Sequence, residues 1–146
     1  MGKVLIMRGV SGSGKSTFTR QHPDAVVCSA DAYFDRIGGY DATLIHEAHK
    51  ACFAEFVGAL EAGTPLVIVD NTHIEAWEMS PLVTFATYKG YEYEIVDIPL
   101  PGDSAEEAVA ILTARNLHGT PQKKIEWMVD RFHKAFIPKH WNRRTA

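Results

Sequence analysis

Residues 9–16 read Gly9-Val10-Ser11-Gly12-Ser13-Gly14-Lys15-Ser16, and they follow the apolar run Val4-Leu5-Ile6-Met7. A helix-like segment, residues 17–21, comes directly after them. The pattern Gly-x-x-x-x-Gly-Lys-Ser/Thr is that of the P-loop, whose glycines let successive backbone N–H groups point at one anion. The following helix adds its positive N-terminal end to the same site. A strand, this loop and a helix in that order predict a binding site for a nucleoside triphosphate.

The side chains of this stretch have separate predicted tasks. Lys15 is expected to reach the terminal phosphates, and the hydroxyl of Ser16 is expected to ligate Mg²⁺. Together with these two residues, the segment predicted to hold the nucleotide comprises Gly9, Ser11, Gly12, Ser13, Gly14 and Thr17.

Length and composition fit one domain over residues 1–146. The chain has 46% hydrophobic and 23% charged residues, which is ordinary for a folded protein. Its apolar runs are too short to span a bilayer, and its N-terminus lacks the pattern of a signal peptide. Cys28 and Cys52 lie in apolar stretches without metal-ligand spacing, which favours buried free thiols in a reducing compartment. We therefore expect a cytoplasmic protein.

Charge is distributed unevenly along the chain, whose formal net charge is −3. Residues 1–114 carry 7 basic and 16 acidic side chains, whereas residues 115–146 carry 8 basic and 2 acidic ones. The basic C-terminal part, with a tail at about 137–146, is either a solvated helix and tail or a surface that faces phosphates. Such a surface could serve ATP, a nucleic-acid strand or both, and its cations include Lys139, Arg143 and Arg144.

Apolar strand candidates alternate with helical patterns along the sequence. The strand candidates are Lys3–Arg8, Ala25–Ser29, Leu66–Val69 and Tyr91–Ile98. The helical candidates run from Asp41 or Thr43 to Ala62, from Ser80 to Tyr88, from Asp103 or Ser104 to about Asn116, and from Gln122 to Phe136. This alternation predicts right-handed crossovers and an α/β fold with a mostly parallel sheet. Ligands of such folds bind at the carboxyl ends of the strands.

Two carboxylates follow predicted strands. Asp31 could face the terminal phosphate and accept a proton from an attacking hydroxyl, with Asp35 as the second choice for this role. Asp70 ends an apolar strand, which is the usual place for a carboxylate that supports a magnesium site. Each has a structural alternative, because Asp31 could cap the next helix and Asp70 could be a turn residue. Asn71 and Thr72 could order water or the acceptor, or cap the helix that follows.

Segment 115–121 contains Gly119 and Pro121 between two helical patterns, so we interpret it as a mobile lid. Arg115 at its start is a candidate for binding the nucleotide and stabilising charge on a transferred phosphoryl group, or else an ordinary arginine at a helix end. The run His46-Glu47-Ala48-His49 superficially resembles a zinc helix, but its histidines are three residues apart rather than four and a third ligand is missing. We expect no zinc.

Taken together, these residues resemble those of polynucleotide-kinase-type P-loop kinases, in particular the Nedd-binding-protein-like branch. The resemblance covers nearly the whole chain. Beyond the P-loop it rests on Ser29-x-Asp31-x-Tyr33-Phe34, Glu47-Ala48-His49, Asp70-Asn71-Thr72 with Ala76-Trp77-Glu78-Met79, Arg115-Asn116-x-His118-Gly119, and the stretch from Lys124-Ile125 to Arg131-Phe132.

The resemblance implies a three-layer P-loop kinase fold with a helical lid. It also implies transfer of the γ-phosphate of ATP to a hydroxyl, commonly at a nucleic-acid 5′ end. In the family pattern Lys15 and Ser16 serve ATP and Mg²⁺, and Asp31 is the general base. Asp70 supports the water shell of the metal, and Arg115 is the lid arginine.

The chain departs from this pattern where substrate is handled. His118-Gly119 stands where a second lid arginine is common, and an arginine that grips the acceptor strand near Tyr33-Phe34 is missing unless Arg36 replaces it. The aromatics near strand ends and Trp141 slightly favour a strand with stackable bases.

Several acceptors stay open. A DNA or RNA 5′-OH is favoured over a hydroxymethylated base in DNA and over a small molecule. A non-catalytic nucleotide-binding module is less expected, because it would not need a base such as Asp31. No pattern sets the strand preference or the oligomeric state.

Overall fold

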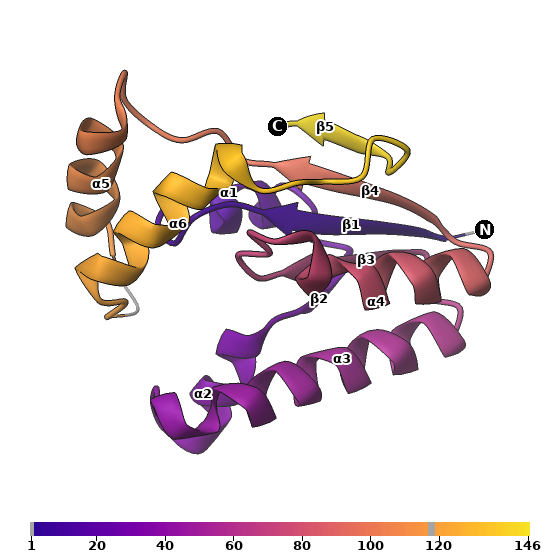
Figure 1. Cartoon of the computed structure of the whole chain (residues 1–146). Helices are drawn as coiled ribbons and strands as arrows, with labels where there is room; N and C mark the ends of the chain where they lie inside the picture. The colour runs from indigo at the N-terminus through magenta and orange to yellow at the C-terminus, as the bar shows by residue number, and fades with distance from the viewer. Residues whose placement is uncertain (1, 117–118) are drawn as a thin grey trace.

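The computed structural model describes residues 2–116 and 119–146, and a five-stranded sheet forms its centre (Figure 1). The strands are β1 (Lys3–Arg8), β2 (Val26–Cys28), β3 (Leu66–Asp70), β4 (Glu92–Asp97) and β5 (Arg143–Thr145). Their order is β2-β3-β1-β4-β5, and every neighbouring pair is parallel. The strand that leads into the P-loop therefore lies in the middle, between the ends of β3 and β4.

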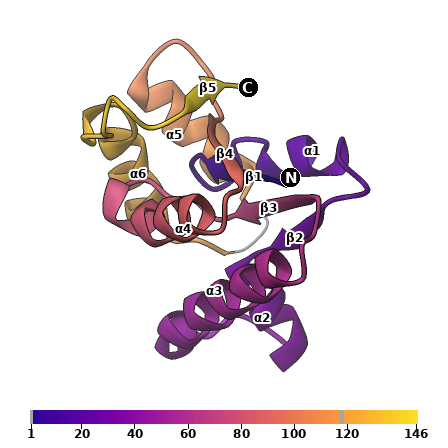
Figure 2. The ribbon, with the colours of Figure 1, turned by 90° about the vertical axis from the view of Figure 1, so that its right-hand side faces the viewer.

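Helices cover both faces of this sheet. They are α1 (Lys15–Arg20), α2 (Ala30–Ile37), α3 (Ile45–Glu61), α4 (Ala76–Tyr88), α5 (Ala105–Ala114) and α6 (Gln122–Lys134), with a 3₁₀ turn η1 (Ala42–Leu44) before α3. Figure 2 shows α1 on one side of the strands and α3 and α4 on the other. The predicted three-layer α/β P-loop fold is confirmed, and its sheet is wholly rather than mostly parallel.

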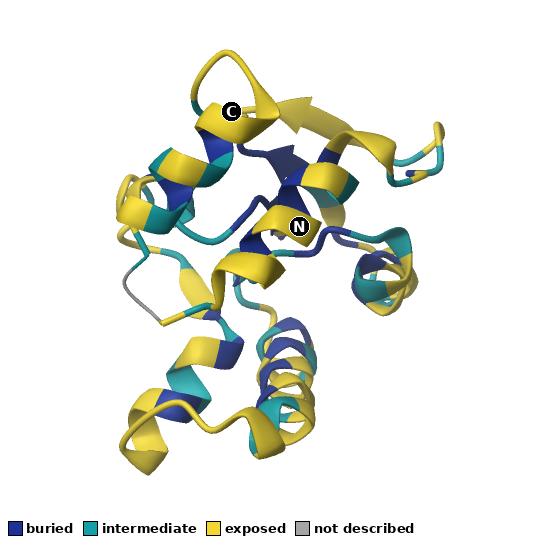
Figure 3. Cartoon of the chain, turned by 60° about the vertical axis from the view of Figure 1, so that its left-hand side comes forward, coloured by how far each residue is buried: buried dark blue, intermediate teal, exposed yellow. Residues whose placement is uncertain are grey.

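Alternation along the strands explains the two layers. Successive strand residues point to opposite faces of a sheet. Val4 and Ile6 of β1 accordingly pack with α3 and α4, whereas Leu5 and Met7 pack with Phe18 of α1. Helix α3 turns one buried stripe toward the sheet, made of Ala48, Cys52, Phe56 and Leu60 (Figure 3). Both cysteines are buried and free, as the sequence predicts.

Helices α5 and α6 lie beyond the carboxyl end of β1, on either side of segment 115–121, for which a mobile lid is predicted (Figure 1). They share a separate apolar cluster with the P-loop residue Val10 and with Ile74, and its other buried members are Ala108, Leu112, Ile125, Met128, Val129 and Phe132. Two residues of the predicted lid segment 115–121, positions 117 and 118, lie outside the described residues. Helices α5 and α6 are therefore packed directly against the P-loop.

A buried arginine joins the elements behind the loop. Arg8, the last residue of β1, is fully buried and donates to the Asp97 Oδ1 atom at 2.9 Å. Its remaining nitrogens donate to the carbonyl oxygens of Ile74 and Phe132. The other carboxylate oxygen of Asp97 accepts from Arg143 of β5 at 2.7 Å. This network connects β1, β4, β5 and α6 immediately before Gly9.

Three elements differ from the sequence prediction. Helix α2 was not predicted; the Ser29 hydroxyl accepts from the N–H of Ala32 at its start. Helix α4 begins four residues before the predicted Ser80, because Glu78 accepts from the N–H of Glu75 and caps the helix there. Strand β5 is polar and exposed, so only its pairing with β4 defines it.

In the described part of the chain, no helix has the length and apolarity to cross a membrane.

Candidate active site

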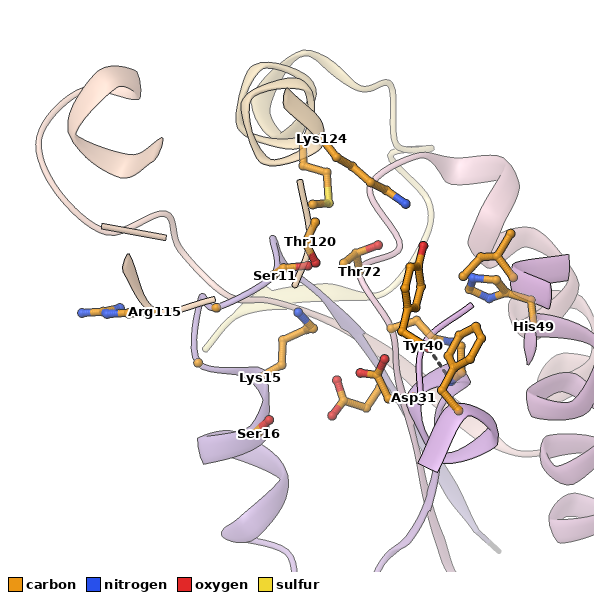
Figure 4. A pocket seen from close by; sticks show the side chains of 18 of the residues that line it. Ser11, Lys15, Ser16, Asp31, Tyr40, His49, Thr72, Arg115, Thr120 and Lys124 are labelled. Atoms are coloured by element: carbon orange, nitrogen blue, oxygen red, sulfur yellow. Dashed lines mark hydrogen bonds between the residues drawn. The ribbon is translucent and has the colours of Figure 1, made fainter. Parts of the chain in front are cut away.

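A cleft of about 790 Å³ opens at the carboxyl ends of β1 and β3 (Figure 4). The predicted residues that line it are Ser11, Gly12, Gly14, Lys15, Ser16, Thr17, Asp31, Asp70 and Arg115. Two other predicted nucleotide-binding residues, Gly9 and Ser13, lie behind this surface. Gly9 donates its N–H to the Thr72 carbonyl, and Ser13 donates its N–H to the Val10 carbonyl. These two residues shape the loop from within.

The side chain of Lys15 is hydrogen-bonded to the P-loop itself. The Lys15 amine donates to the carbonyl oxygens of Gly9 and Val10 at 3.1 and 3.2 Å. Gly14 has a φ of 111°, a left-handed conformation that favours glycine. Burial lowers the pKa of Lys15, and the neighbouring carboxylates of Asp70 and Asp31 oppose that change. The positive charge of Lys15 therefore lies near the carboxylates of Asp70 and Asp31.

Gly12 brings the P-loop against the lid. A side chain at this position would meet the Leu112 carbonyl at 3.3 Å and the Cβ atom of Arg115 at 3.5 Å, and the φ of Gly12 is 84°. Arg115 follows α5 directly and lies at the rim of the cleft, with its guanidinium extending away from Lys15 and Asp31 (Figure 4). Only movement of this side chain would bring its charge over the loop.

Two residues at the end of β3 lie near the P-loop and the start of α2. Asp70 lies beside Met7 in the parallel register, next to the start of the P-loop. Asn71 accepts from the N–H of Ala30 at 2.9 Å, so it anchors the start of α2. The predicted alternative that Asn71 caps the helix that follows is wrong, because Glu75 is the N-cap of α4.

Asp31 lies in the first turn of α2 without being its cap, since Ser29 fills that position. Its carboxylate is exposed, lines the cleft and faces the Lys15 side (Figure 4). Asp35, one turn later, is outside the cleft lining. The geometry favours Asp31 over Asp35 as the carboxylate that meets an acceptor.

His73 is a residue of this region that sequence reasoning did not single out. It is buried with a φ of 47°, and its Nδ1–H donates to the Met7 carbonyl at 2.6 Å. Burial lowers the pKa of His73 to about 4. Non-glycine residues in this conformation cost free energy and cluster at functional sites. Nothing in the local sequence pattern signals this conformation, because it depends on the partner carbonyl in β1.

The wall opposite the P-loop is formed by Phe34, Tyr40, Ile45, His49 and Lys124. Sequence reasoning noted Phe34, His49 and Lys124 but missed Tyr40. The pair Gly38-Gly39 before Tyr40 was the available signal, because consecutive glycines mark a chain reversal after a helix.

Other candidates for handling the acceptor lie elsewhere. Arg36 forms an ion pair with Glu55 at 2.9 Å and lies outside the cleft lining. Tyr33 and Trp77 lie outside the cleft lining. Trp141 packs at the edge of the main apolar core.

Two cations of the basic tail form ion pairs at the surface of the sheet. Arg143 pairs with Asp97 at 2.7 Å and Arg144 pairs with Glu94 at 2.8 Å. Arg144 also lies over the ring of Phe18. The parallel pairing of β5 with β4 places carboxylates beside these two cations. The hypothesis that the tail holds a nucleic-acid strand stays a prediction.

The residues present fit a magnesium ion. The Ser16 hydroxyl and the Asp70 carboxylate line the same cleft as the P-loop backbone. Mg²⁺ takes oxygen ligands and is commonly bound by one or two protein side chains together with substrate phosphates. Ser16 and Asp70 are thus the side chains that would hold it.

Comparison with known proteins finds relatives over almost the whole chain. Residues 4–135 match the AAA_33 family, described as an AAA domain. Over 137 residues the chain is 32% identical to NEDD4-binding protein 2 of Homo sapiens. This match covers 90% of the present chain and 8% of the human protein. The chain thus spans only a small part of the length of this relative.

Solved structures share the fold. A chain of the Pnkp1/Rnl/Hen1 RNA repair complex matches with a TM-score of 0.69 and 23% identity, over 91% of this chain and 44% of that one. The APS kinase CysC of Mycobacterium tuberculosis, in complex with AMPPNP and APS, matches with a TM-score of 0.56 and 18% identity, over 99% of this chain and 88% of that one. At these identities the likeness establishes the fold alone.

Proposed function

We infer the activity of this chain from the AAA_33 family, to which it belongs as a P-loop kinase domain homologous to NEDD4-binding protein 2. The proposed reaction is transfer of the γ-phosphate of ATP to a hydroxyl of a nucleic acid, with a polynucleotide 5′-OH as the favoured acceptor. The similarity to a chain of an RNA repair complex supports this choice.

One observation carries the proposal. The exposed carboxylate of Asp31 faces Lys15 across a cleft whose one side is the P-loop and whose other side is a partly aromatic wall. A phosphoryl donor on the loop and an alcohol on the wall would meet between these two residues. A carboxylate at that point is suited to act as a general base.

The residues then have complementary roles. The acceptor oxygen forms a bond to the γ-phosphorus while the bond from that phosphorus to the β–γ bridging oxygen breaks, and ADP leaves. The hydroxyl proton passes to the Asp31 carboxylate. Lys15 stabilises charge on the transferred phosphoryl group, and Arg115 adds to this when its side chain turns inward. Ser16 and Asp70 would hold Mg²⁺, which would supply positive charge to the phosphate oxygens.

A small-molecule kinase is the second candidate. The ion pair of Arg36 with Glu55 keeps that arginine from the cleft, so the strand-gripping cation expected near Tyr33-Phe34 is absent from the cleft lining among the described residues. A hydroxymethylated base in DNA is a third acceptor, because the same base would activate its alcohol.

Transfer of labelled γ-phosphate to a panel of acceptors tests the proposal. The panel holds 5′-OH DNA and RNA oligonucleotides, duplex DNA with a hydroxymethylated base, and small sugars and sugar acids. We expect label on an oligonucleotide 5′ end, and at least about a 10²–10³-fold loss in Lys15→Ala, which removes a charge that stabilises the transition state. Label on a small alcohol alone would favour the second candidate. ATP binding without any transfer would favour a non-catalytic module.

A further inference from the structure

Ion pairs engage several cations of the C-terminal part of this chain. Four of the eight basic residues in 115–146 are paired with carboxylates: Arg131, Lys134, Arg143 and Arg144. In contrast, no residue in the described ranges forms a hydrogen bond or an ion pair with the Lys124 side chain. Lys124 stands in the first turn of α6 and lines the cleft. Lys124 therefore brings a positive charge of the C-terminal part to the cleft.

Lys124 reaches the cleft from α6. In Figure 4 its side chain extends toward the side on which Tyr40 and His49 lie, whereas Lys15 and Arg115 lie on the other side. Desolvation lowers the pKa of His49, while the charge of Glu78 opposes this change and the charge of Lys124 adds to it. Lys124 brings a positive charge to this part of the cleft.

An aromatic platform lies beneath this charge. The ring of Tyr40 packs on the buried ring of Phe34, with centroids 5.0 Å apart, and 56% of Tyr40 stays exposed. Gly38 and Gly39 reverse the chain after α2 with φ values of 97° and 152°, and this turn brings Tyr40 back over Phe34. Exposed aromatic rings supported from below are suited to stack on a nucleobase.

Asp31, Tyr40 and Lys124 line the same cleft, and they come from α2, the turn after it and α6. An acceptor that meets Asp31 with its hydroxyl and Tyr40 with its base would carry its own phosphate on the third side. The Asp31 carboxylate repels that phosphate, and Lys124 attracts it.

We propose that Tyr40 and Lys124 determine acceptor specificity in this chain, with the first nucleobase stacked on Tyr40 and its 3′-phosphate bound by Lys124. This inference rests on the proposed transfer to a nucleic-acid hydroxyl. It assigns to α6 the acceptor-binding charge that Arg36 does not supply.

The experiment measures KM and kcat with the full chain on three acceptors: a 5′-OH oligonucleotide, a nucleoside 3′-monophosphate and the corresponding nucleoside. We expect Lys124→Gln to raise KM about tenfold for both phosphate-bearing acceptors and to reduce the salt slope for the oligonucleotide by about one. The nucleoside has no phosphate, so its KM should stay unchanged. Lys123→Gln, at a neighbouring exposed lysine outside the cleft lining, is the matched control.

The aromatic part is tested with Tyr40→Ala, which should raise KM for all three acceptors by about 5- to 150-fold, the usual worth of one stacked base. Tyr40→Phe keeps the ring, so its KM shift should be smaller. Tyr88→Ala, at an exposed tyrosine at the end of α4, is the control. An unchanged KM for ATP in each variant reports an intact fold and P-loop.

The outcomes separate the two proposals. If the wild-type chain phosphorylates none of the three acceptors, the proposed function fails and this inference fails with it. If it phosphorylates them but Lys124→Gln behaves like Lys123→Gln, or shifts the nucleoside as much as the nucleotide, only the present inference is overturned.

Discussion

The P-loop side of the cleft is made by consecutive residues 9–16, whereas the opposite wall is assembled from α2, the turn after it, α3 and α6. On the P-loop side the groups expected to bind phosphate are mainly backbone N–H groups and one lysine that is bonded to its own loop. On the opposite wall the exposed side chains of Tyr40, His49 and Lys124 face the cleft.

This difference separates two properties of a kinase. A backbone cradle is fixed by local sequence and is anchored here by the bond from Gly9 to the Thr72 carbonyl. A wall of exposed side chains can change without affecting that cradle, because substitutions at such positions alter the free energy of folding little. We therefore expect changes on the wall to alter the acceptor, and changes on the loop to abolish transfer to every acceptor.

The strongest test of this division is Asp31, which stands between the two sides. Asp31→Asn should lower kcat by about 10²–10⁴-fold, the usual worth of a positioned general base, which is roughly 3–5.5 kcal/mol of barrier. ATP affinity, measured by titration calorimetry, should stay near the wild-type value. Asp35→Asn, one turn away on the same helix, is the control. If Asp35→Asn is inactive and Asp31→Asn is not, the base has been assigned to the wrong carboxylate.

Arg115 tests whether the P-loop side needs the lid to complete it. Arg115→Ala should lower kcat by about 10²-fold and raise KM for ATP less, because the lost charge acts on the transition state more than on bound ATP. Steady-state kinetics over a range of ATP concentrations measures both. Lys123→Ala, an exposed cation on α6, should change neither. An effect on KM alone would make Arg115 a residue that binds ATP without assisting transfer.

The sequence predicts the P-loop side well, because its motif is contiguous and strand–loop–helix order sets its environment. Asp31 and Asp70 could also be located, since both follow apolar strands whose ends meet at one edge of a parallel sheet. Their presence in one cleft agrees with this prediction, and their chemical roles stay predictions.

The remainder depends on contacts between distant segments. Tyr40 reaches the cleft only because a glycine turn returns the chain onto Phe34. The tail cations look available in the sequence, yet β5 pairs them with Asp97 and Glu94, which lie 46 and 50 residues away. Polar strands such as β5 carry no hydrophobic alternation, so periodicity cannot reveal them.

The smallest expected effect concerns the scaffold beneath the P-loop, where His73 is bonded to Met7. Its pKa is lowered from an ordinary value of 6.5 to about 4. Between these values the unfolded chain binds a proton that the folded chain does not, so stability is present at higher pH and is lost as the pH falls. From pH 7 to pH 5 this should lower the free energy of unfolding by about 2 kcal/mol.

Urea unfolding of the wild type and His73→Asn at pH 7 and pH 5 measures this loss. Asparagine tolerates a positive φ but does not titrate, so His73→Asn should be less stable at pH 7 and should lose less stability at pH 5 than the wild type. His140→Asn, at an exposed histidine, leaves His73 in place and should retain the wild-type loss. Parallel curves for the wild type and His73→Asn would show that the acid sensitivity arises elsewhere.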